Sequence, residues 1–309
     1  MRPLPLLLAA ALAAACGAST PVPQAQPQSH PRSAVAGRPA ITWHGGADRP
    51  AKVLVVVEEN HAQRSALSGM PYLASMAKTY GQTTAYRAVT HPSLPNYLGM
   101  VGGSTFGVRD DRNPAAHPVA GPSVFDLALA NGRTAKTYAE AMPSSCALTP
   151  TSPYAVKHNP WAYFSDATSR SNCRRFDVPS GTPASGALRA DVDRGTLPNI
   201  GMLIPDLCHD GHDCSLATAD SWLKGWLQTV MAGPDYRGGR LAIVVTFDED
   251  DNSGDNTVLT TVISPYTRGV RSTAAYTHYS LTRYLAELVG TRPPRSGAAA
   301  PSMRAAFHL

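Results

Sequence analysis

Two short apolar runs decide the fold: Lys52-Val-Leu-Val-Val-Val57 and Leu241-Ala-Ile-Val-Val-Thr-Phe247. Continuous apolar runs of this length are typical of strands that are buried on both faces of a sheet. Further strands are expected near residues 134–138, 199–204 and 258–263. Helical patterns are expected at 71–80, 96–101, 124–130, 216–231 and 278–289. This alternation predicts an α/β fold with a mostly parallel central sheet and helices on both faces.

Composition sets the expected domain organisation of the 309-residue chain. Apolar residues make up 43% and charged residues 16%, and the 25 glycines and 27 prolines indicate long irregular loops. We expect a signal peptide at 1–15, a flexible linker at 16–50, one folded domain at 51–290 and a flexible tail at 291–309. The net charge of +5 comes without any run of lysine or arginine, so nucleic acid is not an expected partner.

The N-terminus indicates export from the cytoplasm. Arg2 precedes an apolar stretch that ends in small residues at Cys16, which is a signal-peptide pattern and is too short to span a membrane. Leu12-Ala-Ala-Ala-Cys16 is similar to a bacterial lipobox, although its leucine stands one position too far upstream. Two outcomes stay open: lipidation of Cys16, which would anchor the chain to a membrane, or secretion after cleavage near Ala15 or Ala18. Either gives a secreted or cell-envelope protein.

Polar residues gather where the predicted strands end. These segments are Glu58–His61, Asp248–Asp251, Asp206–Asp213, His91–Tyr97 and His278. Ligand sites of parallel sheets lie beyond the carboxyl ends of the strands. Carboxylates and imidazoles together suit divalent metal ions, which can hold a phosphate and activate a hydroxyl or a water.

Each of these signals also has a simpler explanation. The acidic run at 248–251 could be a solvated turn, and Ser93 could be only a helix N-cap. An EF-hand is excluded because Leu259 stands at the twelfth position, where glutamate is required. The sequence contains no Gly-x-Ser-x-Gly, His-Glu-x-x-His, phosphate-loop or dinucleotide-binding motif.

Six segments in order carry a family resemblance. They are Val55-Val-Val-Glu-Glu-Asn60, His91-Pro-Ser-Leu-Pro-Asn-Tyr97, Lys157-His-Asn-Pro-Trp161, Pro205-Asp-Leu-Cys-His-Asp-Gly-His-Asp-Cys214, Thr246-Phe-Asp-Glu-Asp-Asp251 and His278-Tyr-Ser. Together they resemble the bacterial phosphoesterase family of the alkaline phosphatase superfamily, which includes secreted acid phosphatases and phospholipase C-type enzymes. The resemblance covers about residues 50–290 and implies an alkaline phosphatase-like fold.

The resemblance implies roles for individual residues. Ser93 resembles the superfamily nucleophile, at a helix N-terminus that favours an anion, and Asn96 would donate to a phosphate oxygen. Lys157 and His158 look like phosphate contacts or a leaving-group acid. His158 would be protonated below about pH 6.5, which suits an acid phosphatase. The implied ligands of the divalent metal are Glu59, Asn60, Ser93, Asp210, His212, Asp248, Glu249 and His278. Two-metal relatives often have Asp-His in place of Asp248-Glu249, which leaves the number of metal ions open.

The resemblance therefore implies hydrolysis of phosphate monoesters, including phosphoinositides, through a phosphoseryl intermediate. The substrate would be a small-molecule or lipid phosphate ester, and a monomer is expected. Two alternatives stay open: a phospholipase C-type phosphodiesterase, and a surface protein that binds phosphate without catalysis. A sulfatase is not indicated, because the Cys/Ser-x-Pro-x-Arg motif is missing.

The cysteines fit this interpretation. Without Cys16, four cysteines remain, and they allow three pairings. A Cys208–Cys214 bridge would brace the loop that holds Asp210 and His212. A Cys146–Cys173 bridge would then close the loop that carries Lys157 and His158. We favour these two pairings, which suit the oxidising surroundings of an exported protein.

Overall fold

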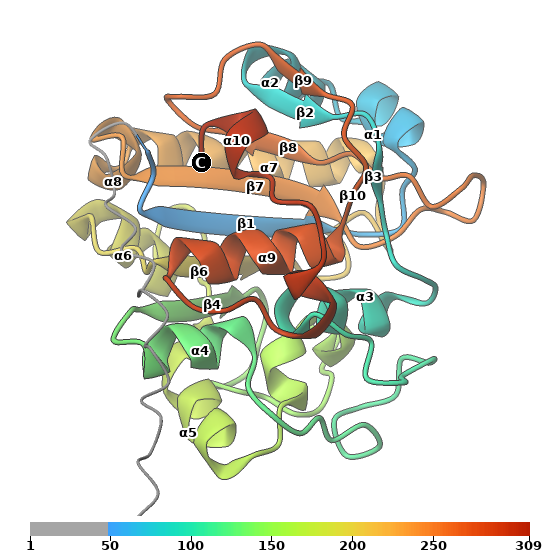
Figure 1. Cartoon of the computed structure of the whole chain (residues 1–309), viewed down its shortest axis with the longest axis vertical. Coiled ribbons are helices and arrows are strands. Elements are labelled where there is room, and N and C mark those ends of the chain that lie inside the picture. The colour runs from blue at the N-terminus through green and yellow to red at the C-terminus, as the bar shows by residue number, and fades with distance from the viewer. Residues whose placement is uncertain (1–48) are drawn as a thin grey trace, which may run out of the picture. The chain divides into compact units, whose positions relative to one another are not determined.

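A computed structural model describes residues 49–309; the predictions for the signal peptide, for Cys16 and for most of the linker lie outside this range. The centre is an eight-stranded sheet with the strand order β5-β4-β6-β1-β7-β8-β2-β9 (Figure 1). The strands are β1 (Lys52–Glu58), β2 (Gly81–Thr83), β4 (Ala135–Ala139), β5 (Asp177–Pro179), β6 (Ile200–Ile204), β7 (Leu241–Phe247), β8 (Thr261–Ile263) and β9 (Val270–Ser272). A second, two-stranded parallel sheet joins β3 (Tyr86–Arg87) to β10 (Tyr276–Thr277).

The two runs that decide the fold lie side by side at the centre of the sheet. β1 pairs in parallel with β7, from Lys52 opposite Leu241 to Glu58 opposite Phe247, and with β6 on its other edge. All of β7, and all of β1 after its first residue, is buried. Because β1 and β7 end in the same register, the residues that follow them emerge next to each other.

Helices cover both faces of the sheet, as predicted. One layer contains α3 (Ser93–Gly102), α4 (Val124–Ala130) and α9 (His278–Leu288); the other contains α1 (Gln63–Gly69), α2 (Pro71–Thr79), α6 (Ala187–Arg194), α7 (Leu216–Ala232) and α8 (Pro234–Arg237). In Figure 1, α9 lies in front of the sheet and α7 behind it. α5 (Ala167–Phe176) packs beside β5. Leu223 and Trp226 are among the residues that α7 buries, which explains its amphipathic sequence. The predicted α/β fold is confirmed.

Two element boundaries differ from the sequence prediction. β8 begins at residue 261 rather than 258, because Val258 lies outside the sheet and donates its N–H to the carbonyl of Tyr86. β8 also runs antiparallel to β7, which is possible because no crossover helix separates them. α3 begins at Ser93, three residues earlier than expected.

The prediction of a flexible tail at 291–309 is wrong. This segment contains η3 (Arg295–Ala298) and α10 (Arg304–Phe307), and the side chains of Met303, Phe307 and Leu309 are fully buried. The polar and small residues near 292–300 suggested disorder, but these three apolar anchors further along give the segment enough surface to bury.

The same segment closes the C-terminal end of α3. The Arg295 guanidinium donates to the carbonyl of Gly102 over 3.0 Å, and the Ser296 N–H donates to the carbonyl of Gly103 over 3.0 Å. Gly103 adopts a left-handed conformation with φ of 67°, and a Cβ there would lie 2.4 Å from the carbonyl oxygen of Pro294. Only glycine fits this contact without displacing the backbone.

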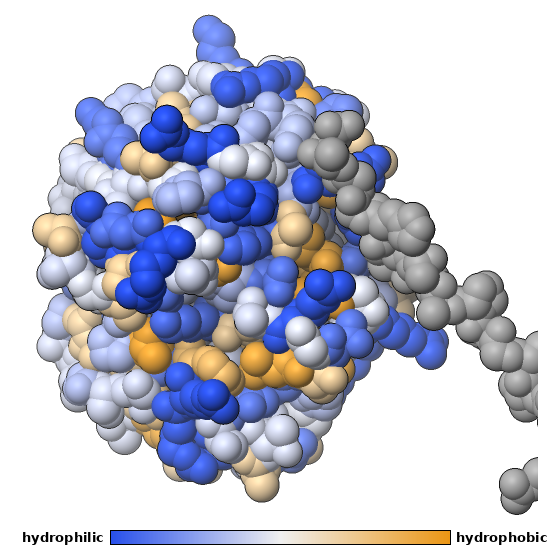
Figure 2. Space-filling view, turned by 90° about the vertical axis from the view of Figure 1, so that its left-hand side faces the viewer, coloured by the Kyte–Doolittle hydropathy of each residue, from blue (hydrophilic) through white to orange (hydrophobic). Residues whose placement is uncertain are grey.

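Figure 2 shows the end of the molecule at which β1 and β7 begin, where hydrophilic side chains cover most of the surface. The predicted site residues lie at the opposite end, where the strands finish. Within residues 49–309, no helix is both long enough and apolar enough to cross a membrane.

Candidate active site

Ser93 is the first residue of α3 and lies beside the end of β1. Its side chain is buried, and its hydroxyl donates a hydrogen bond to Oε1 of Glu59. The N–H of the next residue, Leu94, donates to Oδ1 of Asp111 over 2.9 Å. The first N–H groups of a helix have no partner within the helix and favour negative charge nearby. The predicted nucleophile therefore stands at an anion-favouring helix end, beside a carboxylate that can accept its proton.

Asp248 follows β7 as Glu59 follows β1. Its Oδ1 accepts the N–H groups of Asn60 at 3.1 Å and of Glu249 at 2.7 Å. Asn60 reaches this position with a left-handed φ of 51°, which asparagine tolerates. Oδ2 of Asp248 is buried without a hydrogen-bond partner. Burial, then repulsion from Glu59 and Glu249, raises the pKa of Asp248 well above its usual range.

Glu249, which follows Asp248, is linked through Asn96 to the segment that leads into α3. Nδ2 of Asn96 donates to Oε2 of Glu249 over 2.9 Å, and Oδ1 of Asn96 accepts the N–H of Thr90. Asn96 is fully buried and its side chain is engaged within the protein, so it braces this segment. Burial, then repulsion from Glu59, raises the pKa of Glu249 to about 8.

His158 ends η1 (Val156–His158) and lies between two buried carboxylates. Its Nε2 is 2.9 Å from Oε2 of Glu59, and its Nδ1 is 3.1 Å from Oδ2 of Asp210. These distances suit ion pairs. The ring nitrogens are not aligned for hydrogen bonds with these oxygens. Burial lowers the pKa of His158, but the two carboxylates outweigh burial and raise it to about 9. His158 is therefore a cation at neutral pH. The prediction that His158 is protonated below about pH 6.5 did not include the effect of these two carboxylates on its pKa.

Glu59 is the centre of these charges. Burial raises its pKa, but attraction to His158 and Lys157 and the hydrogen bond from Ser93 outweigh burial and lower the pKa to about 2. The backbone N–H of Glu59 donates to the carbonyl of Asp210 over 2.9 Å, which fixes the end of β1 to the loop that follows β6. Glu59 is thus an ionised, rigidly held carboxylate.

Lys157 and His212 lie at the accessible side of the site. Nζ of Lys157 is 4.0 Å from Oε1 of Glu59, 3.4 Å from Oδ2 of Asp111 and 3.5 Å from Nε2 of His212. Burial lowers the pKa of Lys157, but attraction to Glu59 and Asp111 outweighs burial and raises it. Oδ1 of Asp210 accepts the N–H of His212, so the loop positions this imidazole. Both side chains are partly exposed and can meet a ligand from solvent.

His278, a predicted ligand, lies behind the carboxylates. Its Nε2 is 2.6 Å from the carbonyl oxygen of Asp248 and its Nδ1 is 3.2 Å from the Tyr86 hydroxyl. Burial lowers the pKa of His278 to about 4, so the ring is neutral. A neutral ring donates from Nε2 and accepts at Nδ1, so both nitrogens are engaged. The structure therefore places His278 as a support for the main chain of Asp248, outside the ligand group.

The remaining donor set fits a divalent cation. Glu59 accepts a hydrogen bond from the hydroxyl of Ser93, Asp210 faces the other side of His158, and Asp248 lies beside Asn60 and Glu249 at the end of the next strand. Three buried carboxylate oxygens of this group have no hydrogen-bond partner, and mutual repulsion contributes to the raised pKa values of Asp248 and Glu249; these oxygens are Oε2 of Glu59, Oδ2 of Asp210 and Oδ2 of Asp248. Hard oxygen ligands with excess negative charge are what divalent metal ions prefer.

The phosphoesterase family model matches residues 63–291. The chain belongs to the phosphoesterase family. The sequence resemblance, and the enzyme class that it implies, a phosphoric ester hydrolase, are both confirmed. The phosphoesterase is 30% identical over 252 residues to a protein of Mycobacterium tuberculosis named phosphatidylinositol-3-phosphatase, covering 80% of this chain and 79% of that protein.

Other similarities agree with this assignment. A probable acid phosphatase of Kluyveromyces lactis is 30% identical over 214 residues, covering 64% of this phosphoesterase and 48% of the yeast protein. The chain thus spans about half the length of that relative. A solved structure from the alkaline phosphatase superfamily, from Vibrio parahaemolyticus, superposes with a TM-score of 0.56 at 11% identity, covering 84% of this chain and 72% of the other. At that identity the match shows the fold alone.

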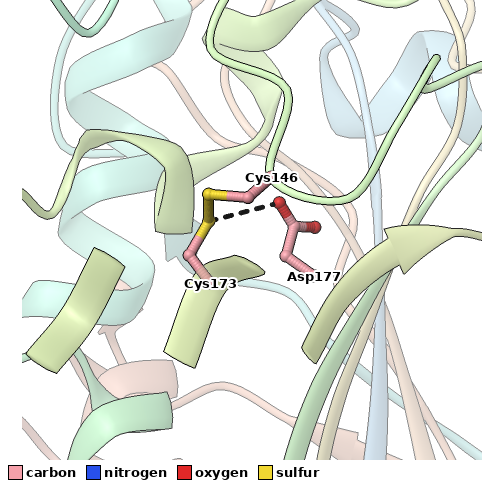
Figure 3. A group of neighbouring side chains, drawn as sticks. All are labelled: Cys146, Cys173 and Asp177. Carbon is pink, nitrogen blue, oxygen red and sulfur yellow. Dashed lines mark hydrogen bonds between the residues drawn. A yellow bond between two sulfur atoms is a disulfide. The ribbon is translucent and has the colours of Figure 1, made fainter. Parts of the chain in front are cut away.

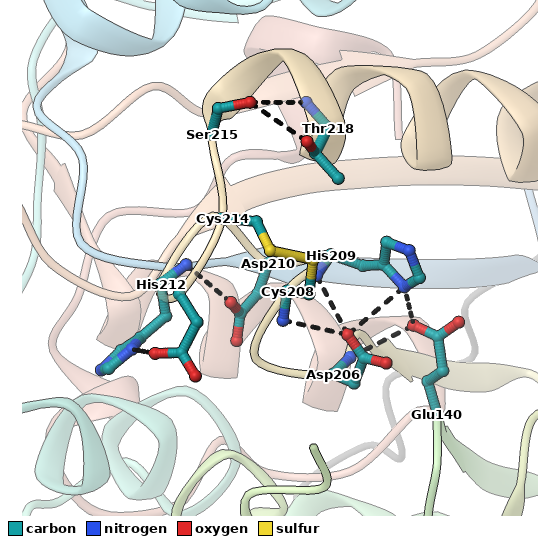
Figure 4. The surroundings of a disulfide bond; sticks show 10 residues. Glu140, Asp206, Cys208, His209, Asp210, His212, Cys214, Ser215 and Thr218 are labelled. Atoms are coloured by element: carbon teal, nitrogen blue, oxygen red, sulfur yellow. Dashed lines mark hydrogen bonds and ion pairs between the residues drawn. A yellow bond between two sulfur atoms is a disulfide. The ribbon is translucent and has the colours of Figure 1, made fainter. Parts of the chain in front are cut away.

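The phosphoesterase has a second group of similar residues at the same edge of the sheet. Nδ1 of His209 lies 3.0 Å from Oε2 of Glu140 and 3.3 Å from Oδ1 of Asp206. The other oxygen of Glu140 accepts the Trp222 indole N–H over 3.0 Å. Figure 4 shows this group, the Glu140 cluster, beside Asp210. We call Glu59, His158 and Asp210 the Glu59 cluster.

Both favoured disulfides of the phosphoesterase are confirmed. Cys208–Cys214 closes the loop that carries residues of both clusters (Figure 4). Cys146–Cys173 lies beside Asp177, whose Oδ2 is 3.6 Å from Sγ of Cys173 (Figure 3). Each bridge fixes a loop that brings polar residues to the edge of the sheet.

Two residues of the site were not predicted from the sequence. His91 lies within the quoted His91–Tyr97 motif, and its ring nitrogens are 3.2 Å from Oε2 of Glu249 and 3.3 Å from Oδ1 of Asp250. Its position two residues before Ser93 was the available signal. Asp111 lies in an irregular loop outside every motif, and nothing in its sequence context indicated that it reaches α3 and Lys157.

Proposed function

We propose that this chain hydrolyses phosphate monoesters, with Ser93 as the nucleophile and a divalent metal ion held by the surrounding oxygens. The observation that carries the proposal is the hydrogen bond from the buried hydroxyl of Ser93 to Glu59 at the N-terminus of α3. A bound divalent ion would lower the pKa of a hydroxyl and offset the charge of the phosphoryl group. Glu59, Asn60, Asp248 and Glu249 would hold it, with Asp210 nearby.

The chain's own residues then define the steps. Glu59 accepts the proton as Ser93 Oγ bonds to phosphorus and the bond to the leaving oxygen breaks. Lys157 donates to the leaving oxygen, because it is the more accessible cation, while buried His158 keeps Glu59 and Asp210 in place. Water then bonds to phosphorus and gives a proton to Lys157, which lost its own to the leaving oxygen; the bond from phosphorus to Ser93 breaks, and Glu59 returns its proton to the hydroxyl.

The test is turnover of p-nitrophenyl phosphate by Ser93→Ala. We expect kcat to fall at least about 10³-fold while the melting temperature stays near that of the wild type, because only the attacking atom is lost. Ser215→Ala is the matched control, since Ser215 is an exposed N-cap of α7 outside the site. Unchanged turnover in Ser93→Ala would reject the nucleophile.

A substrate panel distinguishes the remaining possibilities. It includes alkyl monoesters, diesters and phosphoinositides, the last because the mycobacterial relative carries that name. Monoester preference supports the proposal; turnover of diesters alone supports a phospholipase C-type phosphodiesterase. Binding without turnover on any ester supports a phosphate-binding surface protein.

We also propose that the chain is exported and acts outside the cytoplasm. Two disulfides within the folded domain support this, since disulfides persist in oxidising compartments. Mass spectrometry of the mature N-terminus gives the cleavage point and shows whether Cys16 carries lipid. A mature chain that still begins at Met1 would contradict export by cleavage.

A further inference from the structure

A pocket of about 260 Å³ opens beside the proposed site. Its walls are largely apolar and include Pro150, Tyr154, Val156 and Leu207, with Asn113 and Ser152 as polar lining. Lys157 and Asp111 also line it, and both belong to the site described above. The pocket and the site therefore share two residues and adjoin each other.

The two shared residues, Lys157 and Asp111, connect the pocket to the nucleophile. Nζ of Lys157 is 4.0 Å from the same oxygen of Glu59 that accepts the Ser93 hydroxyl. Asp111 takes the N–H of Leu94, the residue directly after Ser93. A phosphoryl group at Ser93 would thus place its ester oxygen near Lys157 and the carbon atoms beyond that oxygen at the pocket.

The walls of the pocket are held by the fold. The Leu207 N–H donates to the carbonyl of Pro153 over 3.1 Å, and the Leu207 carbonyl accepts the N–H of Asp213 over 2.7 Å. The Tyr154 hydroxyl donates to the carbonyl of Ala147 over 3.0 Å. Leu207 also directly precedes the Cys208–Cys214 bridge. A preformed pocket loses little ordering entropy when a ligand enters.

We propose that this pocket receives the leaving alcohol of the substrate, and that it selects an alcohol of ring size. The inference rests on the proposed function. An apolar cavity of roughly 150 Å³ takes a benzene ring, so this volume suits one ring with small substituents.

The experiment compares kcat/KM for cyclohexyl phosphate and ethyl phosphate, whose leaving alcohols have similar acidity but different size. We expect the wild type to prefer cyclohexyl phosphate about 10-fold or more. Leu207→Ala removes an apolar wall, and Ser152→Phe fills the pocket from an exposed position. Both are expected to reduce the ratio of the two kcat/KM values about 10-fold, a ratio that a general loss of catalysis would not change. Leu148→Ala, at an exposed leucine outside the pocket, is the matched control and keeps the preference.

The outcomes separate this inference from the proposed function. Equal kcat/KM for the two esters in the wild type, or a preference unchanged in folded Ser152→Phe, overturns the inference and leaves the proposed function in place. Loss of the preference in Leu148→Ala also overturns it. If the wild type hydrolyses neither ester, the proposed function fails and this inference with it. Melting temperatures of all variants identify any that fail to fold.

Discussion

The Glu59 cluster and the Glu140 cluster contain the same types of residue, a histidine between two carboxylates, at ends of strands in one sheet. They differ in burial and in how their polar atoms are satisfied. Each Glu140 oxygen accepts a hydrogen bond, and His209 is one-third exposed. His158 is buried, and its nitrogens and its partners' facing oxygens are not aligned for hydrogen bonds. A satisfied network stabilises a loop, whereas unsatisfied buried charge is costly unless a ligand compensates for it.

The sharpest test of this comparison is removal of metal by a chelator. Activity is expected to fall at least about 10³-fold, because charge stabilisation by a metal is worth several kcal/mol. The melting temperature should fall as well, since a metal ion that binds only the folded chain stabilises it. Elemental analysis should show bound metal lost in Glu59→Gln and retained in Glu140→Gln. Equal metal content in these two variants would contradict the distinction.

Histidine substitutions test burial directly. His158→Ala leaves Glu59 and Asp210 as buried carboxylates without their cation, and the free energy of unfolding is expected to fall by about 3–5 kcal/mol. His209→Ala removes a partly exposed partner and should cost no more than about 1 kcal/mol, with activity unchanged. Urea unfolding of both variants measures the difference. Similar losses of the free energy of unfolding in the two variants would show that burial does not distinguish the two clusters.

The loop that joins the clusters gives a smaller effect. The double substitution Cys208→Ser/Cys214→Ser opens a bridge with a sequence separation of 6 and should lower the free energy of unfolding by about 2 kcal/mol. Activity should fall too, since Asp210 and His212 lie within the freed loop. Cys146→Ser/Cys173→Ser, with a separation of 27, is the comparison and should lose about 3.5 kcal/mol. Full activity without the Cys208–Cys214 bridge would show that it does not position the site.

Asp177, a buried carboxylate outside both clusters, gives an effect that depends on pH. Burial raises its pKa to about 7, although Thr137 and Asn159 donate to it over 2.7 and 2.8 Å. In the unfolded chain the pKa is about 4, so unfolding releases a proton between about pH 4 and 7. The free energy of unfolding should therefore fall by about 1.4 kcal/mol per pH unit as pH rises through this window.

Asp177→Asn should remove this dependence of the free energy of unfolding on pH. Asp193→Asn, on the exposed side of α6, is the control and should keep it. Urea unfolding at pH 5 and pH 7 provides the values. A wild-type slope that persists in Asp177→Asn would assign the titration to another group.

Sequence patterns predicted the sheet and most of the site because both follow from local signals. Continuous apolar runs identify β1 and β7, and the residues after them, Glu59 and Asp248, meet because parallel register aligns strand ends. The role of Asp111 could not be predicted, because an irregular loop has no hydrophobic periodicity from which its course through the fold can be inferred.

The differences between the predictions and the structure share another cause. The packing of residues 291–309 depends on distant apolar partners, and the pKa of His158 depends on two carboxylates from separate segments. His278 has the residue type of a ligand, but its hydrogen bonds with Asp248 and Tyr86 decide its role. Such contacts over long sequence distances are visible only in the fold.

The closure of α3 by the C-terminal segment has a consequence for engineering this chain. The carbonyls of Gly99, Gly102 and Gly103 are held by Thr282, Arg295 and Ser296, about one helix length from Ser93. A mutant library that aims to change substrate preference should leave these positions untouched, because any shift of the helix is passed along its axis to the reactive hydroxyl. Conversely, conservative variation at Arg295 offers a way to adjust the placement of Ser93 without altering any group that meets the substrate.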